Sequence, residues 1–447
     1  MASAAEQLVS NMNFSAFAKA SELKQRIIFA LLALIVFRFG SYIPLPGIDP
    51  DVVKSTFGEA GIMNMLSMFT GGALSRMSIF ALGIMPYISA SIIVQLMTLV
   101  SKEMESLKKE GEAGRKKLNQ YTRWLTLLLA ALQALGVAYG LESANAGGAP
   151  AVMIPGWFFR ISTMITLTGG TMFVLWLAEQ ITARGIGNGS SLIIFVGIVA
   201  GLPGAIASMF QLSRSGEIAV WMVFGILLMA IAVIAFVVFM ERAQRRLLVQ
   251  YPKRQVGQKM FGGESSHMPL KLNSANVIPA IFASSILLLP ATWQSFAQPD
   301  SLPDWLNNLL TALHQGQPLF MFLYAALIIF FTFFYTAIVV NPDDMADNLK
   351  KFGGFIPGIR PGKNTAEYID FVVSRLTVVG ALYLAGVCLL PEFIISRMPS
   401  VPFYLGGTSL LIVVSVTLDT IGQIHSHLLA HQYEGLIKKA KLRGRRG

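Results

Sequence analysis

Ten apolar segments of the chain, each near the length that crosses a lipid bilayer, alternate with segments that hold most of its basic residues. A transmembrane helix needs about 20 predominantly apolar residues. The predicted spans lie near residues 27–43, 78–100, 124–141, 157–178, 187–208, 218–240, 275–293, 318–340, 371–394 and 403–429. Because ten is an even number, both ends of the chain are predicted to lie on one side of the membrane.

The Lys and Arg residues predict which side holds the two ends. Of the 35 Lys and Arg residues, 29 lie on the side of the ends: in the N-terminal segment, in the connections after every second span and in the tail. Connections rich in Lys and Arg remain in the cytosol, so both ends are predicted to be cytosolic. The net charge of +11 therefore reflects the topology of the chain.

The composition also places this chain in a membrane. Hydrophobic residues make up 54% of the sequence and charged residues only 13%, whereas a soluble domain carries about 25% charged residues. In lipid, backbone N–H and C=O groups must bond within the protein, and a helix satisfies nearly all of its own groups. The sequence therefore predicts an all-α polytopic membrane protein.

Few residues of the chain suit catalysis, metal binding or coupled transport. Cys388, the single cysteine, lies inside an apolar span, which excludes an internal disulfide and a zinc site built from cysteines. No GxxxxGK[ST] string for nucleotide phosphates and no HExxH string is present, so no enzyme, cofactor or metal is predicted. Asp419 is one of the few acids inside a span, and a coupled small-solute secondary transporter would need acids near the midplane. That class is the less favoured alternative.

Ten spans can be divided into two sets of five. Because five is odd, two duplicated halves would be inserted upside down relative to each other, which is the logic of an inverted repeat. The interface between such halves would form a central passage.

Residues 61–72, GIMNMLSMFTGG, form an apolar stretch that is too short to cross the membrane and ends in two glycines. A helix that does not span is tolerated at membrane depth only where protein or a water-filled cavity covers it. A re-entrant helix in a funnel is one interpretation of this stretch. An interfacial surface helix is the other.

Two predicted cytosolic segments, 241–274 and 341–370, are longer than a turn requires. Long loops of this kind usually carry function. Both mix apolar, aromatic and basic residues, and the Pro and Gly of GIRPG at 358–362 predict a firm turn. Each segment is predicted to protrude as a docking hairpin.

Six strings of the sequence carry a resemblance that is more specific than its hydropathy. They are GGALSRMSIFALGIMPYISASIIVQL, KKEGEAGRKKLNQYTR, AEQITARGIGNGSS, VIPAIFASS, GFIPGIRPG and PFYLGGTSLLIVV. Together they resemble the bacterial SecY family of protein translocation channels. The resemblance runs in order from roughly residue 22 to residue 440 and so covers nearly the whole chain.

This resemblance implies two pseudo-symmetric inverted halves of five helices around a central hourglass pore, with a re-entrant plug helix. The chain would then consist of a cytosolic N-terminal segment (1–21), a first half (22–210) with the plug near 61–77, a second half (211–430) and a basic cytosolic tail (431–447).

The resemblance also implies site residues. The pore ring would comprise Ile84, Ile88, Ser190, Ile194, Ile281 and Ile412. The plug would include Ile62, Met65, Leu66, Phe69, Gly71 and Gly72. The lateral gate would hold Ser89, Ser91, Ser284 and Ser285, and a motor or ribosome would dock at Arg360, Lys253 and Arg254. Ser190 departs from the family pattern, which usually has a bulky apolar residue at this place.

The function implied is a protein-conducting channel that moves unfolded secretory polypeptides across the bacterial plasma membrane and releases membrane-protein segments sideways into lipid. The implied partners are the small membrane subunits SecE and SecG, the motor ATPase SecA, the ribosome and signal-bearing client polypeptides, with no direct DNA binding. The chain would be a passive channel in the inner membrane, driven from outside.

Overall fold

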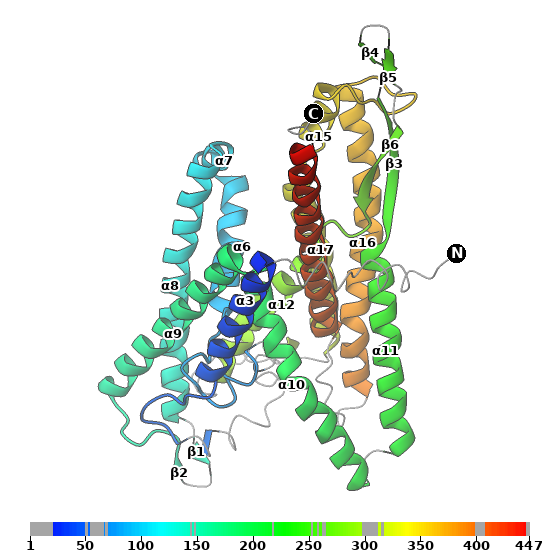
Figure 1. The fold of residues 1–447 in the computed structure, drawn as a ribbon. Coiled ribbons are helices and arrows are strands. Elements are labelled where there is room, and N and C mark those ends of the chain that lie inside the picture. The colour runs from blue at the N-terminus through cyan, green and yellow to red at the C-terminus, as the bar shows by residue number, and fades with distance from the viewer. Residues whose placement is uncertain are drawn as a thin grey trace. The chain divides into compact units, whose positions relative to one another are not determined.

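A computed structural model describes residues 21–49, 52–53, 67, 70–143, 145–146, 149–216, 219–251, 254–256, 259–261, 265–296, 312–313, 317–397 and 407–443. Within this part, a helix lies at each of the ten predicted spans (Figure 1). These helices are α3 (Ser21–Gly40), α6 (Met85–Val100), α8 (Glu112–Ser143), α9 (Trp157–Arg184), α10 (Gly189–Arg214), α11 (Val220–Arg242), α12 (Ile278–Phe296), α14 (Pro318–Val339), α16 (Lys363–Arg397) and α17 (Gly407–Arg443).

Seven helices of the described part are long and apolar enough to cross a membrane: α8, α9, α10, α11, α14, α16 and α17. An eighth candidate is α6 together with the short helix α7 (Lys102–Lys109), which is bent from it by 101°. The chain is therefore a largely helical, multi-pass membrane protein. The number of ten spans stays a prediction, because α3 carries basic residues at both ends and the part of α12 whose side chains are described, Ile278–Leu287, is shorter than a span.

The second predicted span begins later than its hydropathy indicated. Its helix α6 starts at Met85 rather than near residue 78, and residues 70–84 form a series of turns. Pro86 occupies the first turn of α6, where its missing N–H costs no helical hydrogen bond. Gly83, three residues before Pro86, has φ +54°, a left-handed conformation that a right-handed helix cannot continue through.

Backbone contacts fix these turns between α3 and α9. Leu45 N–H donates to the carbonyl of Met77 at 2.9 Å, and Ile79 N–H donates to the carbonyl of Ile43 at 3.0 Å. On the other side, Gly170 of α9 lies directly against the turns, since a Cβ atom there would stand 2.0 Å from the Ile79 carbonyl oxygen. Small residues allow this close approach of a helix to other backbone in a membrane protein.

The described chain forms two compact units. One unit contains residues 1–201 and 416–447, and the other contains residues 202–415. The divisions fall inside α10 and α17, and the halves predicted at 22–210 and 211–430 stay a prediction.

In the first unit, α9 packs along α8 and also contacts α3, and α6 packs against α8. Two ion pairs join α8 to α9. Arg160 lies 2.6 Å from Glu142 near one pair of helix ends, and Arg123 lies 2.7 Å from Glu179 near the other. A two-residue ladder, β1 (Asn145–Ala146) with β2 (Ala149–Pro150), lies in the connection between these helices.

In the second unit, α14 packs between α12 and α16, and a β-ribbon lies in the predicted docking segment 241–274. Strands β3 (Gln244–Gln250) and β6 (Ser265–Lys271) pair antiparallel, with β4 (Arg254–Val256) and β5 (Lys259–Phe261) beyond them (Figure 1). Leu247 and Val249 are buried while Leu248 between them is exposed, which is the period of two expected of a strand with one packed face. This segment therefore contains strands in a largely helical fold.

Candidate functional site

Two of the predicted pore-ring residues lie where α6 begins. Ile88 N–H donates to the carbonyl of Ile84 at 3.2 Å, so the two side chains stand one turn apart on one face of the helix. Both are buried, with 3% and 7% of their surface exposed. Their position follows from the turns before them, because α6 starts directly after the turn at Gly83, with Pro86 in its first turn.

The other two ring positions of the first unit lie near the start of α10. Ile194 is buried, with 2% of its surface exposed, whereas Ser190 is half-buried. The backbone N–H and the hydroxyl of Ser190 both donate to Asn188 Oδ1, at 3.1 and 2.7 Å. Asn188 thus satisfies an N–H at the first turn of α10, as a capping residue does. The hydroxyl of Ser190 is engaged at the helix start, unlike the bulky apolar side chain that the resemblance leads one to expect.

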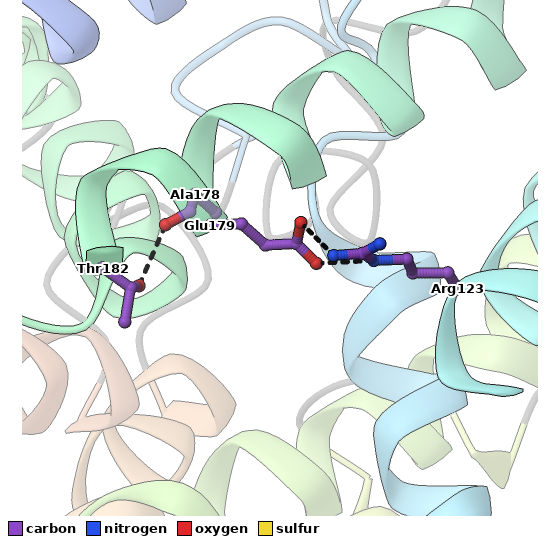
Figure 2. Close-up of polar contacts among 4 residues, drawn as sticks. All are labelled: Arg123, Ala178, Glu179 and Thr182. Carbon is purple, nitrogen blue, oxygen red and sulfur yellow. Dashed lines mark hydrogen bonds and ion pairs between the residues drawn. The ribbon is translucent and has the colours of Figure 1, made fainter. Parts of the chain in front are cut away.

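The loop between α9 and α10 is held from both sides. The Thr182 hydroxyl donates to the Ala178 carbonyl at 2.9 Å, as Figure 2 shows beside the Arg123–Glu179 ion pair, and the same oxygen accepts the Gly189 N–H at 2.8 Å. From α17, the Gln423 side chain accepts the Gly187 N–H at 2.8 Å. The start of α10, and with it Ser190 and Ile194, is therefore placed by side chains of α9 and α17.

Replacing Thr182 by Val should destabilise the protein by about 1–3 kcal/mol, because the Gly189 N–H would lose its acceptor in a half-buried place. Val has the same shape but no hydroxyl. The matched control is Thr166→Val in the same helix, since the Thr166 hydroxyl only donates to the Ser162 carbonyl one turn earlier. Thermal unfolding in detergent measures both variants. An equal loss of stability in the control would contradict the role of Thr182.

The ring positions of the second unit are Ile281 in α12 and Ile412 in α17. They are 7% and 0% exposed. The six predicted ring positions are therefore divided between the two units, four in the first and two in the second. The end of α17 on which Ile412 lies is fixed against α16, because a Cβ atom at Gly407 would stand 2.0 Å from the Val387 carbonyl oxygen.

The predicted gate serines bond mainly within their own helices. In α12, the hydroxyls of Ser284 and Ser285 are buried and both donate to the Ile281 carbonyl, at 2.9 and 2.7 Å. In α6, Ser89 is buried, and Ser91 accepts a hydrogen bond from the Gln95 side chain at 3.2 Å. Because these hydroxyls bond within their own helices, the surfaces of α6 and α12 at these positions carry small and nearly apolar side chains.

Only part of the predicted plug can be placed. Ile62, Met65, Leu66 and Phe69 lie outside the described residues. Gly71 and Gly72 are described, and their φ angles of +66° and +81° fall in the left-handed region, which glycine adopts without strain. The glycine pair therefore makes a turn at the end of the predicted plug.

The two predicted docking segments form one platform. Gln250 at the end of β3 and Phe355 exchange both backbone hydrogen bonds, each at 2.9 Å, so segment 341–370 adds to the edge of the ribbon. Beneath this pairing, Leu247 and Leu270 of the ribbon pack with Ile356 of the loop and with Ile369 of α16. Figure 1 shows the ribbon lying along α16. We call this assembly the docking platform.

Arg360 is exposed on a firm turn of the docking platform. The buried Thr365 donates its hydroxyl to the Arg360 carbonyl at 2.9 Å, and Gly358 and Gly362 on either side have φ angles of +83° and +111°. The backbone of Arg360 is therefore fixed while its side chain is accessible. Arg254 lies in β4, and Lys253 lies outside the described residues.

Sequence reasoning missed the residues that position Ser190 and Ile194 and those that join the two docking segments. Asn188, which stands directly before α10, carries a recognisable signal, because Asn is a preferred cap at a helix start. Gln423 and the pairing of Gln250 with Phe355 have no local signal, because their partners are distant in sequence.

Comparisons with known proteins agree with the resemblance. A model of the SecY family matches residues 78–421. The Protein translocase subunit SecY of Rickettsia conorii is 54% identical over 425 residues, which cover 95% of this chain and 98% of that protein. The protein of the same name from Escherichia coli K12 is 54% identical over 426 residues, which cover 95% and 96%.

Solved structures share the fold. A structure described as a protein conducting channel has a TM-score of 0.65 at 17% identity, covering 90% of this chain and 92% of that one. Sec61 from a canine ribosome–channel complex of the endoplasmic reticulum has a TM-score of 0.62 with the same coverage. With this fold, and with a family match over most of its length, the chain belongs to the SecY family of protein translocase subunits.

Proposed function

We propose that this protein is the channel through which unfolded secretory polypeptides cross the bacterial plasma membrane, and from which membrane-protein segments pass sideways into lipid. The observation that carries the proposal is the identity of 54% over 95% of the chain with relatives named as translocase subunits. A channel of this kind is not an enzyme, because it performs no covalent chemistry on the polypeptide.

An apolar ring of isoleucines is proposed from the family resemblance, and the burial of each of these side chains is consistent with it. Ile84, Ile88, Ile194, Ile281 and Ile412 are each at most 7% exposed, so none of them lies on the outer surface that faces lipid. A β-branched side chain is stiff at χ1, and an apolar constriction excludes water when it is closed. Such a ring would seal against ions at rest and fit closely around a polypeptide in transit.

The lateral gate is proposed to lie along α6 and α12, near Ser89, Ser91, Ser284 and Ser285. The hydroxyls of Ser284 and Ser285 are bonded to their own helix, so opening of a gate beside α12 need not break these hydrogen bonds. A client segment of about 20 residues then enters lipid because each strongly apolar side chain gains about 0.3 to 0.6 kcal/mol at the membrane centre. The protein lowers the barrier to this transfer and supplies no energy.

The energy is proposed to come from outside the chain. SecA or a translating ribosome would dock on the platform, with Arg360 as the first contact and Lys253 and Arg254 as further ones. The exposure of Arg360 on a fixed turn supports this role, because a planar guanidinium binds carboxylate or phosphate with two parallel hydrogen bonds. Sec61, which shares the fold, is in a complex with a ribosome.

The remaining assignments follow from the charge distribution and the family. Both ends of the chain are proposed to be cytoplasmic, and SecE and SecG are proposed as membrane partners. The turn at Gly71 and Gly72 is proposed as the end of a plug near residues 61–77. A small-solute secondary transporter is the alternative function, and the family match does not favour it.

Reconstitution tests the proposed function. Vesicles that contain this protein with SecE and SecG should import a signal-bearing precursor when SecA and ATP are added, as measured by protection of the precursor from added protease. Vesicles without this chain are the control. Absence of import with active SecA, combined with saturable uptake of a small solute, would contradict the channel and support the alternative.

A further inference from the structure

Two arginines hold the turn that leads into α6. Arg38 of α3 donates from Nη1 to the Gly71 carbonyl at 2.7 Å, and Arg76 donates from Nη2 to the same oxygen at 3.0 Å. Arg76 also donates from Nε to the Ser41 carbonyl at 3.4 Å. Both arginines are half-buried. Because hydrogen bonds from charged donors are about twice as strong as neutral ones, this carbonyl is held firmly.

A tyrosine keeps the two guanidinium groups in place. Arg38 Nη2 donates to the Tyr42 hydroxyl oxygen at 3.0 Å. The guanidinium carbons of Arg38 and Arg76 lie 5.1 and 4.2 Å from the centre of the Tyr42 ring. The attraction of both cations to one aromatic ring offsets the repulsion between the like charges. Arg38, Tyr42, Arg76 and the Gly71 carbonyl form what we call the arginine clamp.

The arginine clamp lies at a backbone contact with α10. A Cβ atom at Gly71 would stand 2.7 Å from Arg38 Nη1 and 3.0 Å from the Gly197 Cα atom, so only glycine fits here. Gly197 is three residues beyond Ile194, less than one turn along α10. The clamped segment continues to Ile84 at the start of α6. The clamp therefore joins α3, α10 and the segment that leads into α6, and it meets α10 less than one turn from Ile194.

We propose that Arg38 and Arg76 are positioning residues that hold Gly71 against α10 and thereby set the place of Ile84 relative to Ile194. The clamp would align the ring positions of the first unit. The effect of the clamp on sealing rests on the proposed function, because only a channel has a ring whose alignment controls ion flow. The effect of the clamp on the backbone of the segment before α6 does not depend on that function.

Hydrogen exchange of the full-length protein in lipid nanodiscs tests the backbone effect. In Arg38→Gln and in Arg76→Gln, amides of residues 71–83 should exchange about tenfold faster, the change expected from losing one hydrogen bond to a charged group. Arg38→Lys keeps the charge but replaces the forked guanidinium, which reaches both the Gly71 carbonyl and the Tyr42 hydroxyl, by a single nitrogen, and the segment should exchange at an intermediate rate. The control is Arg214→Gln, an exposed arginine at the end of α10. Unchanged exchange in both Gln variants would overturn the proposal.

Ion conductance in planar bilayers tests the effect on the ring. Both Gln variants should leak ions several-fold more than the unmodified protein at rest and still import precursor. Faster exchange without increased conductance would overturn the claim that the clamp aligns the ring. If the unmodified protein imports no precursor in the same lipids, the proposed function fails, and the exchange measurement still decides whether the arginines hold the segment.

A glycine substitution provides a test that leaves both arginines in place. Gly71→Ala should displace Arg38 and separate the segment from α10, so exchange and conductance should rise as in the Gln variants. Gly111→Ala is the matched control, because Gly111 has a similar φ of +76° but open space where a Cβ atom would lie. Equal exchange and conductance in the two alanine variants would overturn the proposal.

Discussion

Arg360→Glu should reduce SecA-driven import by about a hundredfold while the protein remains folded. The exchange of a guanidinium for a carboxylate removes a charge-assisted contact and adds repulsion, a change of about 3 kcal/mol for a charged group at an interface. The fold should tolerate the change, because the Arg360 side chain is exposed and the turn is held through its carbonyl, which accepts from the Thr365 hydroxyl. Protease protection of a precursor measures import, and the unfolding temperature measures stability.

The matched control for Arg360→Glu is Lys350→Glu. Lys350 is exposed in the last turn of α15 (Pro342–Lys351), in the same docking segment, and undergoes the same reversal of charge. Import should stay near normal in the control. An equal loss in both variants would show a general effect of charge, and normal import by Arg360→Glu would contradict the docking role.

Gly170→Val should destabilise the protein by about 3 kcal/mol or more. A Cβ atom at Gly170 would lie 2.0 Å from the Ile79 carbonyl oxygen and 3.3 Å from the Phe80 ring. Forced overpacking of this kind typically costs about 1–3 kcal/mol, and more where backbone must move. The strain would act on the turns before Ile84, so sealing should also be lost. Thermal unfolding and resting conductance measure the two effects.

The adjacent glycine provides the control for Gly170→Val. Gly169 lies in the same helix, is exposed and has open space where a Cβ atom would be. Gly169→Val should therefore change stability by less than about 0.5 kcal/mol, as is usual for an exposed position. Similar losses of stability in the two variants would show that valine destabilises α9 itself. That result would contradict the claim that the close contact between Gly170 and Ile79 is the cause.

The sequence predicted the helices better than the turns that join them. Helices lie at all ten predicted segments because hydropathy over about 20 residues is a strong signal. The predicted start of α6 was wrong by seven residues, because residues 78–84 are mostly apolar but form turns, with Gly83 at a positive φ and the Ile79 N–H bonded to the Ile43 carbonyl. Apolar character alone does not distinguish a helix from a packed turn.

The site was predicted in part, through the resemblance rather than through spacing. The hydrogen bond from the Ile88 N–H to the Ile84 carbonyl places these two side chains on one helix face. Nothing local predicted that Arg38 and Arg76 would meet at Gly71, or that Gln423 would hold the loop before Ser190. These contacts join residues that only the fold brings together. The roles of the ring, plug, gate and docking residues stay predictions.

A crosslinking map of a stalled client tests the central claim most directly. Photoreactive residues placed singly at 88, 194, 281 and 412 should each crosslink to a precursor arrested in transit, and residues at exposed positions 228 and 322 of α11 and α14 should not. Crosslinks from all four buried positions are the result predicted for an apolar ring around the polypeptide. Crosslinks confined to the exposed positions, or to lipid alone, would contradict it.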